Sequence, residues 1–365
     1  MAPNPPEPRV WLSRADVQAA AQAGEITPRQ AERLWARWAA APAPAPAPAI
    51  AAPRFDFTHT LYYLGGLLAI GAMTLFMTLG WDWFGPWGVL ALALGYAMAA
   101  LAVTNHLLGQ GLRTPAGLLA TLAVCLVPLA VWALQTGLGL LPVGGPAEYR
   151  DYHRFIDWRW LTLEFATLAA AAVALWRYRL PFLVMPVAVT LWYLNMDVAH
   201  LLMQKDGFDW RFTRDVSLVF GLATCGLAVW VDLRCRLATE PEHRQDFAFW
   251  LYLFGALMAW GGLSLRESDS EWAKLGYGLI NAALVFLGAA IGRRVFTVLG
   301  ALGVAGYLAY LSHRVFADSL LFPFALTLLG LGVVALGIWW QRHEAGLHAR
   351  LAGWLPAALR PLAQG

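Results

Sequence analysis

The chain has 365 residues, of which 59% are hydrophobic and only 13% are charged, with a formal net charge of +3. A soluble domain carries roughly 25% charged residues, so this composition excludes an ordinary soluble fold and indicates a polytopic membrane protein. The apolar runs are continuous, which excludes alternating barrel strands, and the basic residues flank these runs, which argues against a nucleic-acid partner.

Residues 1–39 predict a cytoplasmic helical hairpin. Ser13 opens the first helix and Gly24 closes it, while Thr27 to Gln30 forms a capping box that starts the second helix. A hairpin of this size cannot bury a core alone, so we expect it to dock on the membrane domain or on a protein partner. A tail with only helical tendency is the alternative. The second helix gathers its large apolar residues on one side: Leu34, Trp35 and Trp38.

Residues 40–53 are a nearly pure Ala-Pro segment, which favours extended polyproline II and predicts a semi-rigid linker. The transmembrane helix bundle follows, from residue 54 to residue 341. A helix of about 20 apolar residues spans the hydrocarbon core, and about ten segments meet this requirement. The predicted spans are residues 61–79, 87–104, 115–134, 160–176, 180–203, 216–231, 247–265, 275–292, 295–311 and 320–340.

The distribution of lysine and arginine predicts the orientation. With the N-terminus inside, 17 of the 26 basic residues lie on the inner side and 9 lie in the outer loops, as the positive-inside rule requires. Ten spans then place both ends in the cytoplasm. Residues 342–365 form an interfacial cytoplasmic tail with an amphipathic helix, whose apolar face comprises Leu347, Leu351, Trp354, Leu355 and Ala358.

Residues 54–75 resemble residues 244–265, with ten identities in 22 positions and no gap. Both segments begin with Arg-x-Asp-Phe and run from the inside to the outside. Duplication would give two parallel halves, an arrangement found in some transporters. Convergence of two segments with the same inner anchor and the same small-residue packing is the alternative, and the sequence leaves both open.

Several ionisable and polar residues fall within the spans and are candidates for a functional site, because such groups are costly in a membrane. Near the outer boundary they predict an outward-facing polar pocket, and an ordinary solvated rim is the reading that we favour. The candidate pocket comprises Glu164, Asn195, Asp197, His200 and Asp318. Deeper in the membrane, Asn281 is expected to join helices by hydrogen bonding rather than to bind an ion.

The chain carries no phosphate loop, no zinc-protease motif, no nucleophile elbow and no dinucleotide fingerprint. The three cysteines, Cys125, Cys225 and Cys235, lack the spacing of a metal site. We therefore expect no catalytic residue, no metal and no cofactor, and the sequence gives enzyme status no positive support.

Four parts of the chain resemble a known family. They are the hairpin, the Arg-x-Asp-Phe motif at residues 244–247, the segment GGLSLRESDSEWAKLGYGLINAALVFLGAAIGRRVFTVLGALGVAGYLAYL at residues 261–311, and DSLLFPF at residues 318–324. The family is an uncharacterised group of bacterial multi-pass inner-membrane proteins that contain domains of unknown function. The resemblance covers most of the chain and is strongest after residue 244. It implies a bacterial inner-membrane location, and it implies no substrate or catalytic residue.

Three classes of function remain compatible with the sequence. A non-enzymatic membrane sensor or assembly factor, with the hairpin as its working part, is our leading interpretation. A transporter built from parallel repeats would handle an apolar or amphipathic solute, since the deep spans hold few polar groups. A membrane enzyme acting on a lipid-linked substrate would require the outer acids to converge. The lipid bilayer is the one partner that every class shares.

Overall fold

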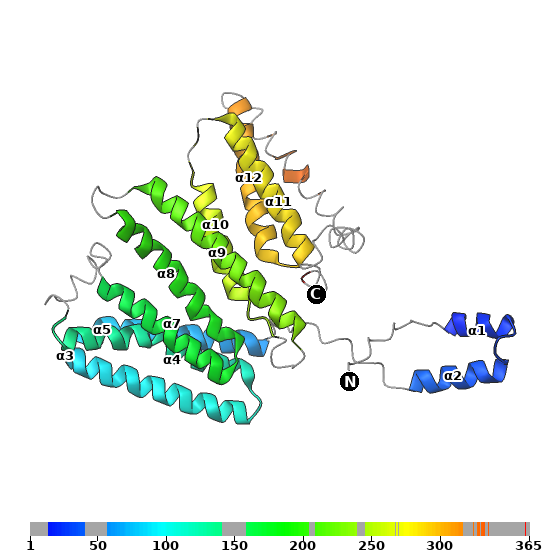
Figure 1. Cartoon of the computed structure of the whole chain (residues 1–365), viewed down its shortest axis with the longest axis horizontal. Coiled ribbons are helices and arrows are strands. Elements are labelled where there is room, and N and C mark those ends of the chain that lie inside the picture. Colours follow the sequence, from blue (N-terminus) through cyan, green and yellow to red (C-terminus); the bar gives the residue numbers. More distant parts are fainter. Residues whose placement is uncertain are drawn as a thin grey trace, which may run out of the picture. The chain divides into compact units, whose positions relative to one another are not determined.

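The computed structural model describes residues 14–40, 57–140, 158–203, 209–238, 245–266, 268 and 270–316, together with scattered residues between 324 and 362. Within these ranges every secondary-structure element is a helix (Figure 1). The chain divides into two compact units, Met1–Ala49 and Ile50–Gly365. The predicted all-α class is therefore confirmed for the described residues.

The first unit contains the helical hairpin of α1 (Arg14–Gln22) and α2 (Pro28–Ala40). The predicted capping box is present: the Thr27 amide donates to Gln30 Oε1 at 2.9 Å, and the Gln30 amide donates to Thr27 Oγ1 at 3.3 Å. These two bonds satisfy amide groups that a helix start otherwise leaves without partners. Gly24 takes a φ of +78° after α1, as glycine readily does. Local chemistry thus defines the hairpin turn at both of its ends.

The second unit is a bundle of long helices. Its first helix, α3, is bent where Gly85 takes a φ of 60° immediately before Pro86, a site at which proline also removes a helical hydrogen bond. The elements are α3 (Phe57–Gly109), α4 (Arg113–Cys125), α5 (Val127–Gly137), α7 (Trp158–Tyr178), the 3₁₀ turn η2 (Pro181–Leu183), α8 (Val184–Met203), α9 (Trp210–Leu237), α10 (Phe249–Ser264), α11 (Glu271–Ile291) and α12 (Arg294–Phe316).

Seven helices in the described ranges are long and apolar enough to cross a membrane. They are residues 83–109, 113–137, 160–178, 181–202, 210–237, 271–291 and 294–314, which match the predicted second to sixth, eighth and ninth spans. Large apolar side chains on these helices are exposed, including Trp176 at 79% and Val219 at 65%. Such surfaces suit contact with lipid, and the helices indicate a multi-pass membrane protein.

The predicted count of ten is not reached by the described residues. The expected seventh span, α10, has 16 residues, or about 24 Å of helix at 1.5 Å per residue, which is shorter than the roughly 30 Å hydrocarbon core. The expected first span forms the part of α3 before Gly85. The expected tenth span and the amphipathic tail lie largely outside the described residues. Ten spans and cytoplasmic ends therefore stay predictions.

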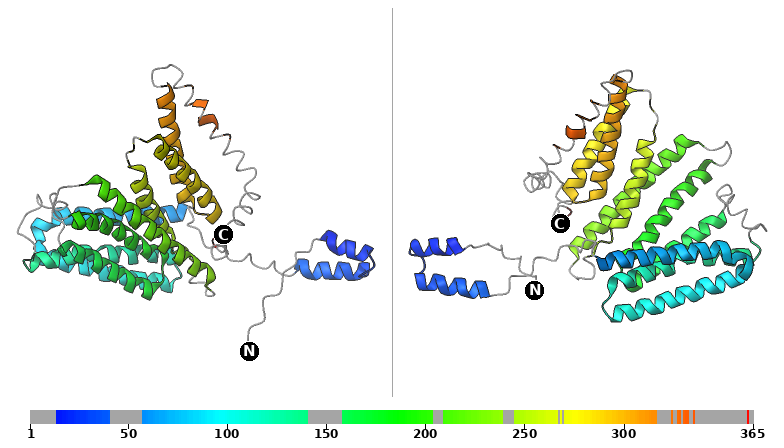
Figure 2. Two further views of the ribbon diagram at one scale, coloured as in Figure 1. Left: turned by 45° about the horizontal axis from the view of Figure 1, so that its top comes forward. Right: turned by 180° about the vertical axis from the view of Figure 1, so that it is seen from behind.

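Figures 1 and 2 show α3, α4, α5 and α7 on one side of α8 and α9, with α10, α11 and α12 on the other. The backbones of α9 and α10 approach one another closely. A Cβ atom added at Gly221 of α9 would lie 2.2 Å from the Ala259 backbone nitrogen, and one added at Gly255 of α10 would lie 3.0 Å from the Cys225 nitrogen. Glycine thus permits direct backbone contact between these two helices.

The two glycine pairs that the internal repeat aligns differ in how far their packing agrees. Gly255 lies directly against α9, whereas a Cβ added at its counterpart, Gly65 in α3, would meet no described atom within 4 Å. At the second aligned pair, Gly71 and Gly261, an added Cβ would meet no described atom in either segment. Duplication would place both glycines of a pair against an equivalent helix. The Arg54 and Arg244 anchors lie outside the described residues.

Candidate functional site

Two of the predicted site residues face one another between α7 and α8. Glu164 and Asp197 are 6% and 5% exposed, and their carboxyl groups lie close enough to interact electrostatically. Glu164 is six residues from the start of α7 and Asp197 is six residues from the end of α8, or about 9 Å along each helix. Burial corrects the expectation of a solvated rim for these two side chains.

The other predicted site residues do not join this pair in the described structure. Asn195 is two residues from Asp197, a separation of about 200° around a helix, and its side-chain amide donates to Ser217 Oγ of α9 at 3.0 Å. His200 is exposed. Asp318 lies outside the described residues. Among the described residues, Glu164 and Asp197 lie together, while Asn195, on another face of α8, contacts α9. The five-residue pocket stays a prediction.

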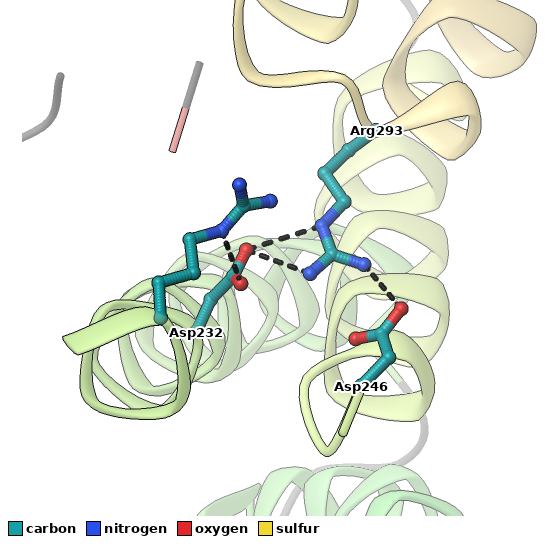
Figure 3. Close-up of polar contacts among 4 residues, drawn as sticks. Asp232, Asp246 and Arg293 are labelled. Atoms are coloured by element: carbon teal, nitrogen blue, oxygen red, sulfur yellow. Dashed lines mark hydrogen bonds and ion pairs between the residues drawn. The ribbon is translucent and has the colours of Figure 1, made fainter. Parts of the chain in front are cut away.

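A buried ionic network, which the sequence analysis did not identify, joins the ends of α9 and α10 to the turn between α11 and α12. Arg293 points between two carboxylates (Figure 3). Its Nη1 donates to Asp246 Oδ2 at 2.6 Å, and its Nε and Nη2 lie 3.1 and 2.7 Å from Asp232 Oδ2. Arg236, one turn after Asp232, donates from Nε to Asp232 Oδ1 at 2.9 Å. Three helix ends are therefore tied at one point.

The described members of the network balance in charge, with two carboxylates facing two guanidinium groups. The side chains of Arg293, Asp232 and Asp246 are 11%, 2% and 13% exposed. Burial disfavours the charged guanidinium, but the hydrogen bonds and charges of Asp246 and Asp232 outweigh it and raise the pKa of Arg293 above its ordinary value. The guanidinium also lies 4.9 Å from the centre of the buried Tyr252 ring, a cation–π contact. Arg293 therefore stays charged and paired at any physiological pH.

Local geometry places Arg293 in this position. Gly292 ends α11 in the left-handed conformation with a φ of 69°, which glycine adopts without strain. The chain reverses at once into α12, so Arg293 occupies the turn between these two helices. The sequence held one signal for the network: Asp232 and Arg236 are spaced one helical turn apart.

Asn281 joins three helices, as predicted. It is fully buried in α11, its Oδ1 accepts from Trp260 Nε1 of α10 at 3.0 Å, and its Nδ2 donates to the Tyr277 carbonyl at 2.9 Å. A Cβ atom added at Gly303 of α12 would lie 1.9 Å from Asn281 Oδ1. The amide is thus satisfied by protein groups and packed against a glycine, which is an arrangement for helix association.

Among the described residues, no group of three or more His, Cys, Asp or Glu side chains is arranged to hold a metal ion. Comparison with protein-family models, with curated proteins and with solved structures finds no match to the chain.

Proposed function

We propose that the protein is a non-enzymatic sensor or assembly factor of the bacterial inner membrane, anchored by its helix bundle and working through its N-terminal hairpin. The observation that carries this proposal is the division of the chain into two units, the first of which contains the capped hairpin. An Ala-Pro segment follows the hairpin in sequence, and this composition is typical of semi-rigid spacers.

The outer surface of α2 supports a role in binding. Arg29, Arg33 and Arg37 are exposed and spaced four residues apart, so they form one basic stripe along the helix. Leu34 and Trp35 are only half-buried by α1. Arginine and tryptophan are the residues most enriched where proteins bind one another. We infer a protein partner with an acidic surface.

The interior of the bundle supports an anchoring role. The balanced network around Arg293 and the contacts of Asn281 hold α9 to α12 together at two depths. Buried groups that are paired in this way resist rearrangement. A transporter with two parallel halves is the weaker alternative, because the packing at Gly255 is not repeated at Gly65.

A photo-reactive residue at Ala36, which is exposed between Arg33 and Arg37, tests the hairpin proposal in the full-length protein in native membranes. We expect one discrete cross-linked protein, and we expect Arg33→Glu with Arg37→Glu to abolish it by reversing the charge of the stripe. The same probe at Gln18, exposed on α1, serves as the matched control and should give no such product. Cross-links to lipid alone would contradict the proposal.

A further inference from the structure

The facing carboxyl groups of Glu164 and Asp197 belong to α7 and α8, two helices that are long and apolar enough to cross a membrane. Each residue is more than nine-tenths buried. Neither Glu164 carboxyl oxygen receives a hydrogen bond from another described group. Of the elements packed on α7, which are α4, α5, α8 and η2, the described residues bring one titratable side chain against Glu164, and that side chain is Asp197.

This arrangement is unfavourable if both groups are ionised. A buried carboxylate without a hydrogen-bond donor costs several kcal/mol, and a second negative charge beside it adds repulsion. One proton removes both penalties, because it neutralises one carboxyl group and makes that group a hydrogen-bond donor to the other. Carboxyl pairs that share a site in proteins commonly hold one proton between them in this way.

We propose that Glu164 and Asp197 form a proton-binding site that holds one exchangeable proton between α7 and α8. The proton comes from water, forms an O–H bond on one carboxyl group and is donated in a hydrogen bond to the other. On release it returns to water, both groups become anionic, and no other bond changes.

The ligand is a proton rather than a metal cation because the site offers too few ligands. Ca²⁺ takes 6–8 oxygen ligands and Mg²⁺ demands near-ideal octahedral geometry, whereas the described residues bring two carboxyl groups together here and form no group of three or more metal-ligating side chains. Asn195, two residues before Asp197, faces α9 and bonds Ser217. The pair lies about 9 Å from the ends of its helices, within reach of water at one membrane face. The site stands independently of the role proposed for the hairpin.

An apolar carbodiimide tests the site in the full-length protein in its membrane, because it modifies protonated carboxyl groups in apolar surroundings and mass spectrometry locates the product. We expect modification at Glu164 or Asp197 at neutral pH, falling as the pH is raised. The exposed Asp209 serves as the internal control and should stay unmodified. This measurement needs no variant, so it does not depend on a substitution being tolerated.

Variants then test whether the proton is shared. Glu164→Gln gives Asp197 an amide donor and removes the second carboxyl group, so modification of Asp197 at neutral pH should be largely lost. Asn195→Leu, on the opposite face of α8, should leave the modification unchanged. Absence of modification at both carboxyl groups in the unaltered protein overturns the proposal. Protection by sodium at constant pH also overturns it, because the ligand would then be a metal cation.

Discussion

Replacing Arg293 by methionine should lower the free energy of unfolding by about 3–5 kcal/mol, the cost of breaking a buried ion pair by removing one partner. The substitution keeps much of the side-chain volume but removes the guanidinium that pairs with Asp246. Of the two arginines described beside Asp232, Arg236 remains. Asp232 is 2% exposed, so its remaining charge is poorly solvated. Unfolding of the purified protein in mixed micelles, titrated with a denaturing detergent, measures the loss.

Arg294 supplies the matched control. It is adjacent in sequence and exposed, so Arg294→Met should change the stability by no more than about 0.5 kcal/mol, as surface substitutions usually do. Combining Arg293→Met with Asp246→Asn removes a stranded charge and should recover part of the loss, since residues in one network do not act additively. Equal effects of the two arginine substitutions would show that the network contributes nothing specific.

Among the described glycines that lie against the backbone of a neighbouring helix, Gly221 should be the one at which substitution by alanine destabilises the protein most. The new Cβ would lie 2.2 Å from the Ala259 nitrogen and 2.7 Å from its Cα, and backbone atoms cannot rotate away as a flexible side chain can. Overpacking of this kind costs typically about 1–3 kcal/mol and occasionally more. In the same titration, the variant should unfold at a lower concentration of the denaturing detergent than the unaltered protein.

The control lies on the same helix. A Cβ added at Gly226 meets no atom within 4 Å, so Gly226→Ala should leave the protein unchanged or stabilise it by up to about 1 kcal/mol, the difference in helix propensity between alanine and glycine. If both substitutions had the same effect, close α9–α10 contact would not be the cause.

Features encoded within one or two helical turns were predictable from the sequence. The Thr27 capping box, the Gly24 turn and the reversal at Gly292 follow from local backbone chemistry. The role of Asn281 followed from the cost of leaving an amide unpaired among apolar residues. Each of these features depends only on the residue itself and on its near neighbours in the sequence.

The ionic network and the carboxyl pair could not be predicted in the same way. Asp232 and Arg293 are 61 residues apart in sequence, and each follows the end of a predicted span, where a solvated charge is the ordinary expectation. Their meeting depends on how α9 and α11 pack in three dimensions. The separation of Asn195 from Asp197 was available from helix geometry alone, since a spacing of two residues places side chains on opposite faces.

Transmembrane topology is the most direct test of the central claim, an integral bundle with a cytoplasmic hairpin. In a background in which Cys125, Cys225 and Cys235 are replaced, single cysteines at Ala36, Asp209 and Arg342 are probed in intact cells with a membrane-impermeant maleimide. The account predicts labelling at position 209 from outside, and labelling at positions 36 and 342 only after permeabilisation. Labelling of position 36 in intact cells would contradict the account, and labelling of position 342 alongside 209 would show an odd number of spans.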